Sequence, residues 1–427
     1  MLQILDMQTI QNSYYPTVEA IRKAANQLSA IFMPTPLIPN LLASDKYEAN
    51  ILFKREDLQM VRSYKIRGAY YKISNLSLEE RIKGVVCASA GNHAQGVAYA
   101  CQKLGIKATI FMPLPTPKQK LKQVTFFGKE WVDIILEGDS FDDAYQAARM
   151  HCDKNEQVFI PPFDDEQIIE GQATVGLEIL EASITPVDYL ILPLGGGGLA
   201  AGVSSIFKVL SPNTKIIAVE PEGAASMQAA LNAGKPVRLK NIDKFVDGAA
   251  VKKVGILNFN ICQQNLDRVI TVSEGKVCST ILELYNQDAI VVEPAGALSV
   301  AALEQLGPEL KGKNVVCIIS GSNNDIARTE EIRERSLLYE GLKHYFIVRF
   351  PQRAGALKEF VAEILGPDDD IVHFEYSKKT AREQGPALVG IELKDPKDFS
   401  PLLERMKSRL FFGEYLNEKP ELFGALV

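Results

Sequence analysis

The sequence lacks an excess of basic residues: 47 Lys and Arg stand against 53 Asp and Glu, and the formal net charge is −6. A nucleic-acid-binding protein would carry a basic patch or stripe, so this charge balance argues against that class. The N-terminal residues lack the basic segment and apolar stretch of a signal peptide, and we expect none. Apolar residues make up 46% and charged residues 23%, which is globular composition and argues against a disordered chain.

No uncharged run is suited to crossing a membrane. The longest, Tyr189–Phe207, contains Pro193 and four consecutive glycines, which are typical of a strand, a turn and the start of a helix. The six cysteines are scattered, and no two have the spacing of a metal site or a thioredoxin motif. We therefore predict buried, reduced cysteines in a cytoplasmic protein.

The 427 residues are too many for one compact core, so two or three domains are expected. Short apolar runs alternate with amphipathic helical stretches, which predicts an α/β fold with mainly parallel sheets covered on both faces. Nine such strands suggest two α/β domains. The predicted strands are at 51–54, 84–88, 108–113, 131–136, 157–160, 188–194, 215–219, 268–272 and 314–320. Helices between them include 92–104, 118–127 and 141–151.

The pattern changes after about Glu340. Strands and helices are then predicted in the order β-α-β-β-α, which fits a separate ferredoxin-like α+β unit. These elements are at 344–350, 355–365, 371–376, 386–393 and 399–410, and the charged stretch 327–340 would connect them to the main body. We expect a main body at 1–335, with a smaller subdomain at about 56–158, and a C-terminal domain at 341–427.

The first chemical motif is the heptapeptide Ser63–Ala69, with the sequence Ser-Tyr-Lys-Ile-Arg-Gly-Ala. Its Lys65 stands between small and aromatic residues at a predicted helix start. Partial burial would lower the pKa of this lysine and favour the neutral amine that attacks a carbonyl, as a Schiff base requires. A solvated lysine is the plainer interpretation, and it stays ahead for this heptapeptide taken alone.

The second motif, Ser89–Gly96, follows a predicted strand and opens a predicted helix. Free N–H groups at a helix N-terminus, together with the Ser89 and Asn92 side chains, form an anion site suited to a carboxylate. The alternative is an ordinary helix cap at Asn92. His93 alone would more often be structural than catalytic.

The third motif is the run Gly195–Gly198 followed by Leu199, between a predicted strand and a predicted helix. Glycines let a backbone approach a ligand closely and turn several N–H groups toward it, and a phosphate is the natural guest. The run matches neither a P-loop nor a dinucleotide fingerprint. A flexible turn is the alternative, although idle glycines carry an entropic cost.

The fourth motif is Ser320, which follows the last strand of the main body, where α/β sheets bind ligands. Alone it would be an ordinary turn residue. Together the four motifs supply an amine nucleophile, a carboxylate site, a phosphate site and a hydroxyl. This combination suits pyridoxal phosphate acting on an amino acid.

On these motifs the sequence resembles the fold-type II pyridoxal-phosphate enzymes, and specifically the threonine dehydratases, or threonine deaminases. The resemblance extends over about residues 17–335, and the four motifs stand in the family's order. It implies that Lys65 forms the Schiff base with the cofactor. It also implies that Phe53 packs on the pyridine ring, that Asn92 bonds the 3′ oxygen, and that Ser320 faces the pyridine nitrogen.

The resemblance implies two further sets of contacts. The phosphate would be wrapped by Gly195, Gly196, Gly197, Gly198 and Leu199. The substrate would be bound by Ser89, Gly91, Asn92 and His93. Lys65 would act as the general base on L-threonine, which would yield 2-oxobutanoate and ammonia, and L-serine would yield pyruvate.

Two positions depart from the related serine racemases. Ala90 stands where those enzymes carry a second serine, their base on the opposite face of the substrate, which argues against racemisation. Near Glu220, where they bind a divalent metal, this chain has Ala224 and Ser226 and lacks a second carboxylate, so we predict no metal site. Other fold-type II enzymes, such as a serine dehydratase, a threonine synthase or a β-replacing synthase, are alternatives. A non-catalytic amino-acid sensor is a further one.

The tail resembles the ACT-like regulatory domain of the biosynthetic threonine dehydratases, in one copy where longer members carry two. The turn Arg353–Leu357 puts small residues at a helix start, where free N–H groups would receive a carboxylate. The resemblance implies feedback inhibition by isoleucine and a homo-oligomer, expected to be a tetramer. A domain that only joins subunits is the alternative.

Overall fold

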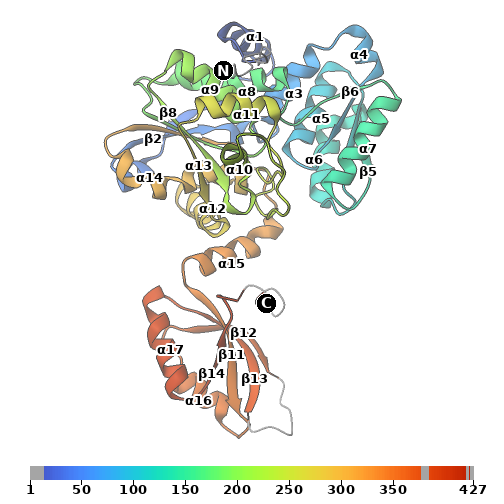
Figure 1. Cartoon of the computed structure of the whole chain (residues 1–427). Coiled ribbons are helices and arrows are strands. Elements are labelled where there is room, and N and C mark those ends of the chain that lie inside the picture. Colours follow the sequence, from blue (N-terminus) through green and yellow to red (C-terminus); the bar gives the residue numbers. More distant parts are fainter. Residues whose placement is uncertain (1–13, 377–383, 420–422, 424–427) are drawn as a thin grey trace, which may run out of the picture. The chain divides into compact units, whose positions relative to one another are not determined.

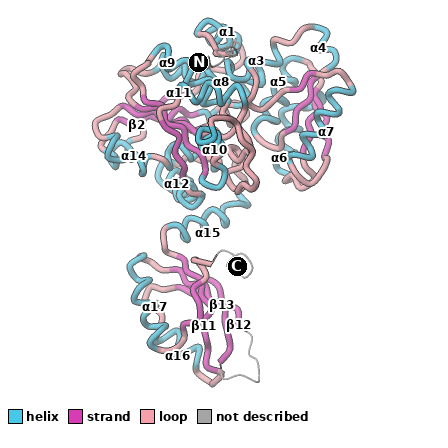
Figure 2. Tube along the Cα trace, in the orientation of Figure 1, coloured by secondary structure: helices cyan, strands magenta, loops and turns pink. Residues whose placement is uncertain are grey.

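The computed structural model describes residues 14–376, 384–419 and 423. The chain divides into two units. The first contains the described residues up to Glu274 together with Leu284–Asp325. The second contains Gly275–Glu283 and the described residues from Ile326 onward. Figure 1 and Figure 2 show that the first unit holds two separate sheets with helices on their faces, while the second holds a single sheet.

The larger sheet of the first unit has six strands in the order β1-β2-β10-β7-β8-β9. All neighbouring strands are parallel except β1, which pairs antiparallel with β2. The strands are β1 (Leu37–Pro39), β2 (Asn50–Arg55), β7 (Tyr189–Pro193), β8 (Lys215–Pro221), β9 (Arg268–Val272) and β10 (Asn314–Ile319). The central ones are apolar along their length because helices cover both of their faces.

Small residues allow the helices over this sheet to pack closely. A Cβ on Gly176 of α8 would lie 2.6 Å from Ile206 of α9, and one on Gly202 of α9 would lie 2.4 Å from a carbonyl oxygen of α8. The helices are α1 (Val18–Leu28), α2 (Leu41–Tyr47), α8 (Glu166–Ala182), α9 (Gly198–Leu210), α10 (Ser226–Ala233), α11 (Ile256–Asn265), α13 (Pro294–Ala301) and α14 (Leu303–Leu310). The helix α12 (Glu274–Asp288) is divided between the two units, since its residues Gly275–Glu283 belong to the second.

The smaller sheet of the first unit is parallel throughout, in the order β5-β4-β3-β6. Its strands are β3 (Val85–Ala88), β4 (Ala108–Met112), β5 (Val132–Leu136) and β6 (Val158–Phe159). The helices of this subdomain are α3 (Lys65–Ser74), α4 (Leu78–Lys83), α5 (Asn92–Leu104), α6 (Lys118–Gly128) and α7 (Phe141–Lys154). Capping boxes at Ser77 and Ser140 begin α4 and α7.

The second unit has an antiparallel sheet in the order β12-β13-β11-β14. Its elements are α15 (Thr329–Tyr339), β11 (Lys343–Pro351), α16 (Ala356–Glu363), β12 (Asp370–Tyr376), β13 (Gln384–Glu392), α17 (Phe399–Ser408) and β14 (Phe412–Tyr415). Phe346, Phe360 and Leu402 lie in an apolar core to which the sheet and both α16 and α17 contribute. This is the ferredoxin-like α+β arrangement predicted from the sequence, completed by β14.

All nine predicted strands of the main body are present, and their ends lie within two residues of the predicted ones. The sequence did not reveal β1 or β14, which are only three and four residues long. The C-terminal segment of the second unit begins at Ile326, about ten residues before the predicted end of the main body, and it includes α15. Glu334 of α15 bonds both Lys343 and Tyr345 of β11, which explains that grouping.

The six cysteines are buried and free, as predicted. None of the helices in the described part of the chain is both long and apolar enough to span a bilayer.

Candidate active site

A cavity of about 960 Å³ lies in the first unit and is lined by both of its subdomains. It opens where β3, β7 and β10 end, since the loops after these strands carry three of the four sequence motifs. The carboxyl ends of parallel strands are the usual ligand-binding edge of such sheets. The predicted residues that line the cavity are Lys65, Ser89, Gly91, Asn92, His93, Gly195, Gly196, Gly197, Gly198, Leu199 and Ser320.

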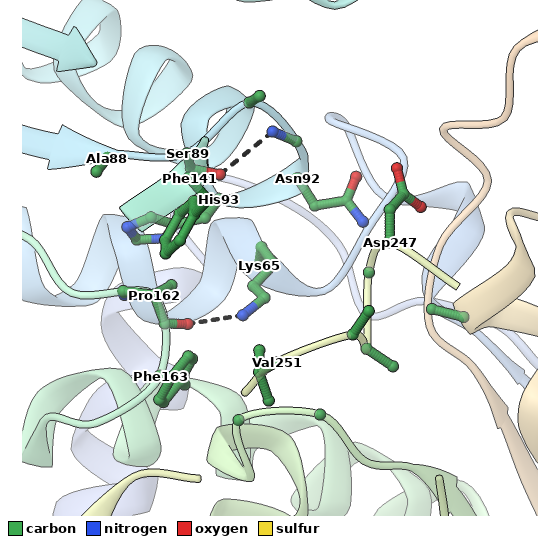
Figure 3. Close-up of a pocket in the computed structure, with 18 of the residues that line it drawn as sticks. Lys65, Ala88, Ser89, Asn92, His93, Phe141, Pro162, Phe163, Asp247 and Val251 are labelled. Atoms are coloured by element: carbon green, nitrogen blue, oxygen red, sulfur yellow. Dashed lines mark hydrogen bonds between the residues drawn. The ribbon is translucent and has the colours of Figure 1, made fainter. Parts of the chain in front are cut away.

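Lys65 is the first residue of α3, and its amine reaches into the cavity (Figure 3). Nζ donates a hydrogen bond to the Pro162 carbonyl at 2.6 Å and lies 6.0 Å from the centre of the Phe163 ring. No carboxylate forms an ion pair with it among the described residues. Burial lowers the pKa of Lys65 to about 8, although the charge of Glu293 acts in the opposite direction. The neutral amine is therefore available near neutral pH, as a nucleophile requires.

The loop after β3 leaves backbone N–H groups free at the start of α5. Gln95 is the first residue of this helix whose N–H finds a carbonyl, that of Gly91, within the described residues. Gly91 itself donates to Ser89 Oγ at 3.2 Å (Figure 3). A Cβ on Gly91 would meet no atom within 4 Å, so this glycine borders open space in the cavity. The free N–H groups beside that space suit an anion.

His93 contributes a neutral ring to the cavity wall. Its Nε2 lies 2.9 Å from the Ile160 carbonyl oxygen, and the residue is only 4% exposed. Burial lowers the pKa of His93 to about 3, and the charge on Lys65 lowers it further. Nε2 therefore carries a proton that it donates to this carbonyl. The ring does not supply a positive charge for binding a carboxylate.

The glycine loop after β7 lines the cavity, and two protein groups hold its Gly196 carbonyl. Asn258 Nδ2 donates to the Gly196 oxygen at 2.8 Å, and the Gly255 N–H donates to the same oxygen at 3.1 Å. Among the described residues, no acceptor is found for the N–H groups from Gly195 to Ala200. A Cβ on Gly196 would lie 2.2 Å from the Phe163 ring, so glycine is required there. This cradle of N–H groups fits a phosphate.

Ser320 and Phe53 have different positions. Ser320 directly follows β10, lines the cavity, and accepts the Tyr64 N–H at its carbonyl at 3.2 Å. Phe53 is buried within β2 at 1% exposure and is not part of the cavity wall, so the structure does not bear out its expected contact with the ring. Two aromatic residues line the cavity beside Lys65, namely Tyr64 and Phe163. Tyr64 belongs to the heptapeptide itself, whereas Phe53 is a buried residue of a central strand.

Three residues of the site were not apparent from the sequence, and two of them, Glu293 and Asn323, line the cavity. Glu293 and Asn323 are bonded to Asn92, and Asn258 holds the glycine loop. The sequence does single out Glu293, because it is the only charged residue between Asp288 and Glu304. Nothing in the sequence singles out Asn258, since its role depends on a contact with a loop about sixty residues away in the sequence.

Glu220, near the metal position of related racemases, binds backbone N–H groups in this chain. Its carboxylate accepts the N–H groups of Met227 and Gln228 at 2.7 and 2.9 Å, at the start of α10. No cluster of three or more His, Cys, Asp or Glu side chains suited to a metal occurs among the residues that the structure describes.

Comparison with known proteins gives matches over both units. The family of pyridoxal-phosphate dependent enzymes matches residues 28–321, and the C-terminal regulatory domain of threonine dehydratase matches residues 334–422. The chain is 54% identical to the biosynthetic L-threonine dehydratase of Halalkalibacterium halodurans, over 96% of this chain and 99% of that protein. It is also 54% identical to the corresponding protein of Bacillus subtilis, over 96% and 97%.

Two solved structures are similar to this chain over about three quarters of its length. Threonine deaminase isoform 2 of Solanum lycopersicum is 39% identical, with a TM-score of 0.71 over 75% of this chain and 95% of that one. Maize serine racemase is 30% identical, with a TM-score of 0.70 over 76% and 99%.

Proposed function

The chain belongs to the pyridoxal-phosphate-dependent enzymes, among the biosynthetic threonine dehydratases, and we propose that the cavity around Lys65 is its active site. The enzyme dehydrates and deaminates L-threonine to 2-oxobutanoate and ammonia. The observation that supports this location is the convergence of a buried lysine amine, two sets of free N–H groups and the Ser320 hydroxyl in one cavity. L-Serine, which would give pyruvate, fits the same site.

The residues present fit pyridoxal phosphate. Lys65 would hold it covalently, the N–H groups of Gly195–Leu199 would bind its phosphate, and Asn92 would bond its 3′ oxygen. Ser320 would offer a neutral hydroxyl to the ring nitrogen. When bound, the cofactor withdraws electrons from the substrate α-carbon, which makes the α-proton acidic and lets the β-hydroxyl depart.

Lys65 would then serve as the base. Its lowered pKa leaves a substantial fraction neutral near pH 8, and a neutral amine accepts the α-proton. The Pro162 carbonyl, 2.6 Å from Nζ, would orient this amine by accepting one of its hydrogens. The ammonium that forms would keep that acceptor.

The substrate carboxylate would bind at the loop after β3. Ser89, Gly91, Asn92 and His93 surround the open space above Gly91, and the first N–H groups of α5 face it. The neutral His93 ring shapes this wall, so the helix N-terminus would provide the attraction for the anion.

The second unit carries the proposed control of this activity, which we assign to isoleucine. A hollow of about 400 Å³ lies beside the start of α16. Gly355, with φ of +87°, precedes the helix without a side-chain cap, so its first N–H groups are open to a carboxylate. Leu357, Phe374 and Tyr376 supply apolar walls for a branched side chain. Assembly of the expected homotetramer is a second candidate role for this unit.

Reduction and labelling test the assignment of the active site. Borohydride reduction of the purified yellow protein, followed by peptide mapping, is expected to place the cofactor on Lys65. A label on another lysine would refute the assignment. A coupled assay with threonine, with and without isoleucine, tests the control.

A further inference from the structure

We propose that Glu293 is a positioning residue that holds the Asn92 amide with its N–H side toward the cofactor, an inference that rests on the proposed function of this cavity. Glu293 Oε1 accepts a hydrogen bond from Asn92 Nδ2 at 2.7 Å. Asn92 Oδ1 accepts in turn from Asn323 Nδ2 at 2.6 Å, and the same Nδ2 donates to the Val61 carbonyl at 2.9 Å. These four groups form one continuous chain of hydrogen bonds.

The chain has a single direction because it ends in an acceptor on each side. Above its pKa of about 7 the Glu293 carboxylate, like a backbone carbonyl, can only accept hydrogens. The Glu293 end therefore requires the Asn92 N–H side, and the Val61 end requires the Asn323 N–H side. An amide alone could adopt either orientation at little cost. With both ends fixed, Asn92 keeps one N–H hydrogen free for the 3′ oxygen of the cofactor.

The surroundings leave room for this carboxylate. Glu293 is 4% exposed and precedes α13, yet its side chain makes no cap bond to that helix. A Cβ on Gly321 would lie 2.7 Å from Oε1, and one on Gly248 would lie 3.2 Å from it. Glycine at these two positions, on different elements, opens the space that the carboxylate occupies. The backbone of Asn323 also favours the charged form of this carboxyl and lowers its pKa.

Keeping a charge here costs fold stability. Burial raises the pKa of Glu293 to about 7, and Asp247 raises it further, whereas Asn92 and Lys120 lower it. The charge of Glu293 also raises the pKa of two residues of the heptapeptide, Lys65 and Tyr64. A carboxyl with a raised folded pKa loses stability as pH rises from its unfolded value through the folded one. A residue kept only for packing would be better as a neutral isostere, so this cost points to a role in the site.

The experiment compares Glu293→Gln with the parent holoenzyme. A glutamine keeps the shape but can present either amide group, so the direction of the chain is lost. We expect the dissociation constant for pyridoxal phosphate to rise by roughly tenfold or more. The pH dependence of the visible band of the bound cofactor is expected to shift. The unfolding midpoint of the apoprotein at pH 8 is expected to equal or exceed that of the parent.

A second variant changes the other end of this chain of hydrogen bonds. Asn323→Asp replaces the donor to Asn92 Oδ1 by an acceptor, and it should weaken cofactor binding in the same way. Glu170→Gln is the matched control, because Glu170 of α8 also has a pKa raised by burial but bonds Tyr14 and does not line the cavity. It should keep the parent's cofactor affinity and band.

Parental affinity and band in both Glu293→Gln and Asn323→Asp would overturn the proposal. A Glu293→Gln apoprotein that unfolds much earlier than the parent would also overturn it, since Glu293 would then be structural. If the parent and Glu170→Gln themselves show no label on Lys65, the proposed function fails instead, so the two failures are distinguishable.

Discussion

Lys65 Nζ donates a hydrogen bond to the Pro162 carbonyl oxygen at 2.6 Å, which ties the first residue of α3 to the segment that precedes α8. The amine is thus held in one place by the protein itself. A free lysine side chain would lose up to about 2 kcal/mol of rotamer entropy when fixed. Much of that cost is met on folding, so the amine is already positioned when a ligand arrives.

Replacing Lys65 by alanine is expected to lower threonine turnover by at least about 10³-fold, because the variant loses both the anchor and the base. The measurement is a coupled assay for 2-oxobutanoate at saturating cofactor. Lys83→Ala is the control, since Lys83 pairs with Glu79 and Glu156 at the surface. Retained turnover in Lys65→Ala would exclude the lysine as base.

The rate of cofactor uptake by the apoprotein is expected to rise with pH and to level off near pH 8. Only the neutral amine attacks the aldehyde, and the lowered pKa of Lys65 puts half of it in that form at about pH 8. Below this pH the rate should fall about tenfold per unit. Stopped-flow absorbance checks this. A rate that climbs steadily past pH 10 would mean that the amine has an ordinary pKa.

Gly197→Ala is expected to weaken binding of pyridoxal phosphate and to cost about 1–2 kcal/mol of stability, because Gly197 has φ of +93°. A Cβ there would also lie 2.8 Å from Asn258, which holds the loop. Gly234→Ala separates the two effects, since Gly234 also has a positive φ, +65°, but borders open space away from the cavity. It should lose stability and keep affinity. Equal affinities for pyridoxal phosphate in both variants would mean that the glycine run is only a turn.

Dehydration is expected without appreciable racemisation. Ala90 lines the cavity and offers no base. Chiral chromatography of the L-serine left after partial turnover should show almost no D-serine. Ala90→Ser, which restores a hydroxyl, should raise the D-serine yield. Substantial D-serine from the parent enzyme would contradict the assignment of Lys65 as the one base.

Isoleucine is expected to raise the threonine concentration needed for half-saturation, by a factor that corresponds to a coupling of about 1–3 kcal/mol. Phe374→Ala removes an apolar wall of the hollow beside α16 and should weaken this response. Phe126→Ala is the control, since Phe126 is 73% exposed on the first unit and should leave the response as in the parent. Saturation curves that isoleucine does not move would leave assembly as the role of the second unit.

The strands around the site could be predicted because a parallel strand covered on both faces must be apolar along its length, as Tyr189–Pro193 is. The short edge strand β1 was missed, since three residues carry no periodic signal. Motifs that are contiguous in sequence, such as the one around Lys65, also predicted residues that line the cavity.

Residues that depend on contacts across the chain could not be predicted. Glu293 reaches Asn92 across about two hundred positions, and neither residue signals the other locally. Phe53 shows the opposite error. The family resemblance assigned it to the cofactor ring, but Phe53 is buried in β2 and does not line the cavity.

The burial of all six cysteines has a practical consequence for work on this enzyme. A buried thiol has a raised pKa and no access to solvent, so it reacts with an alkylating reagent only after the protein around it opens. The rate of alkylation at each cysteine therefore reports how readily the native structure around it opens. The cysteines lie on elements of both subdomains, such as Cys87 in β3 and Cys317 in β10, so mass spectrometry of the alkylated peptides would report which subdomain opens first.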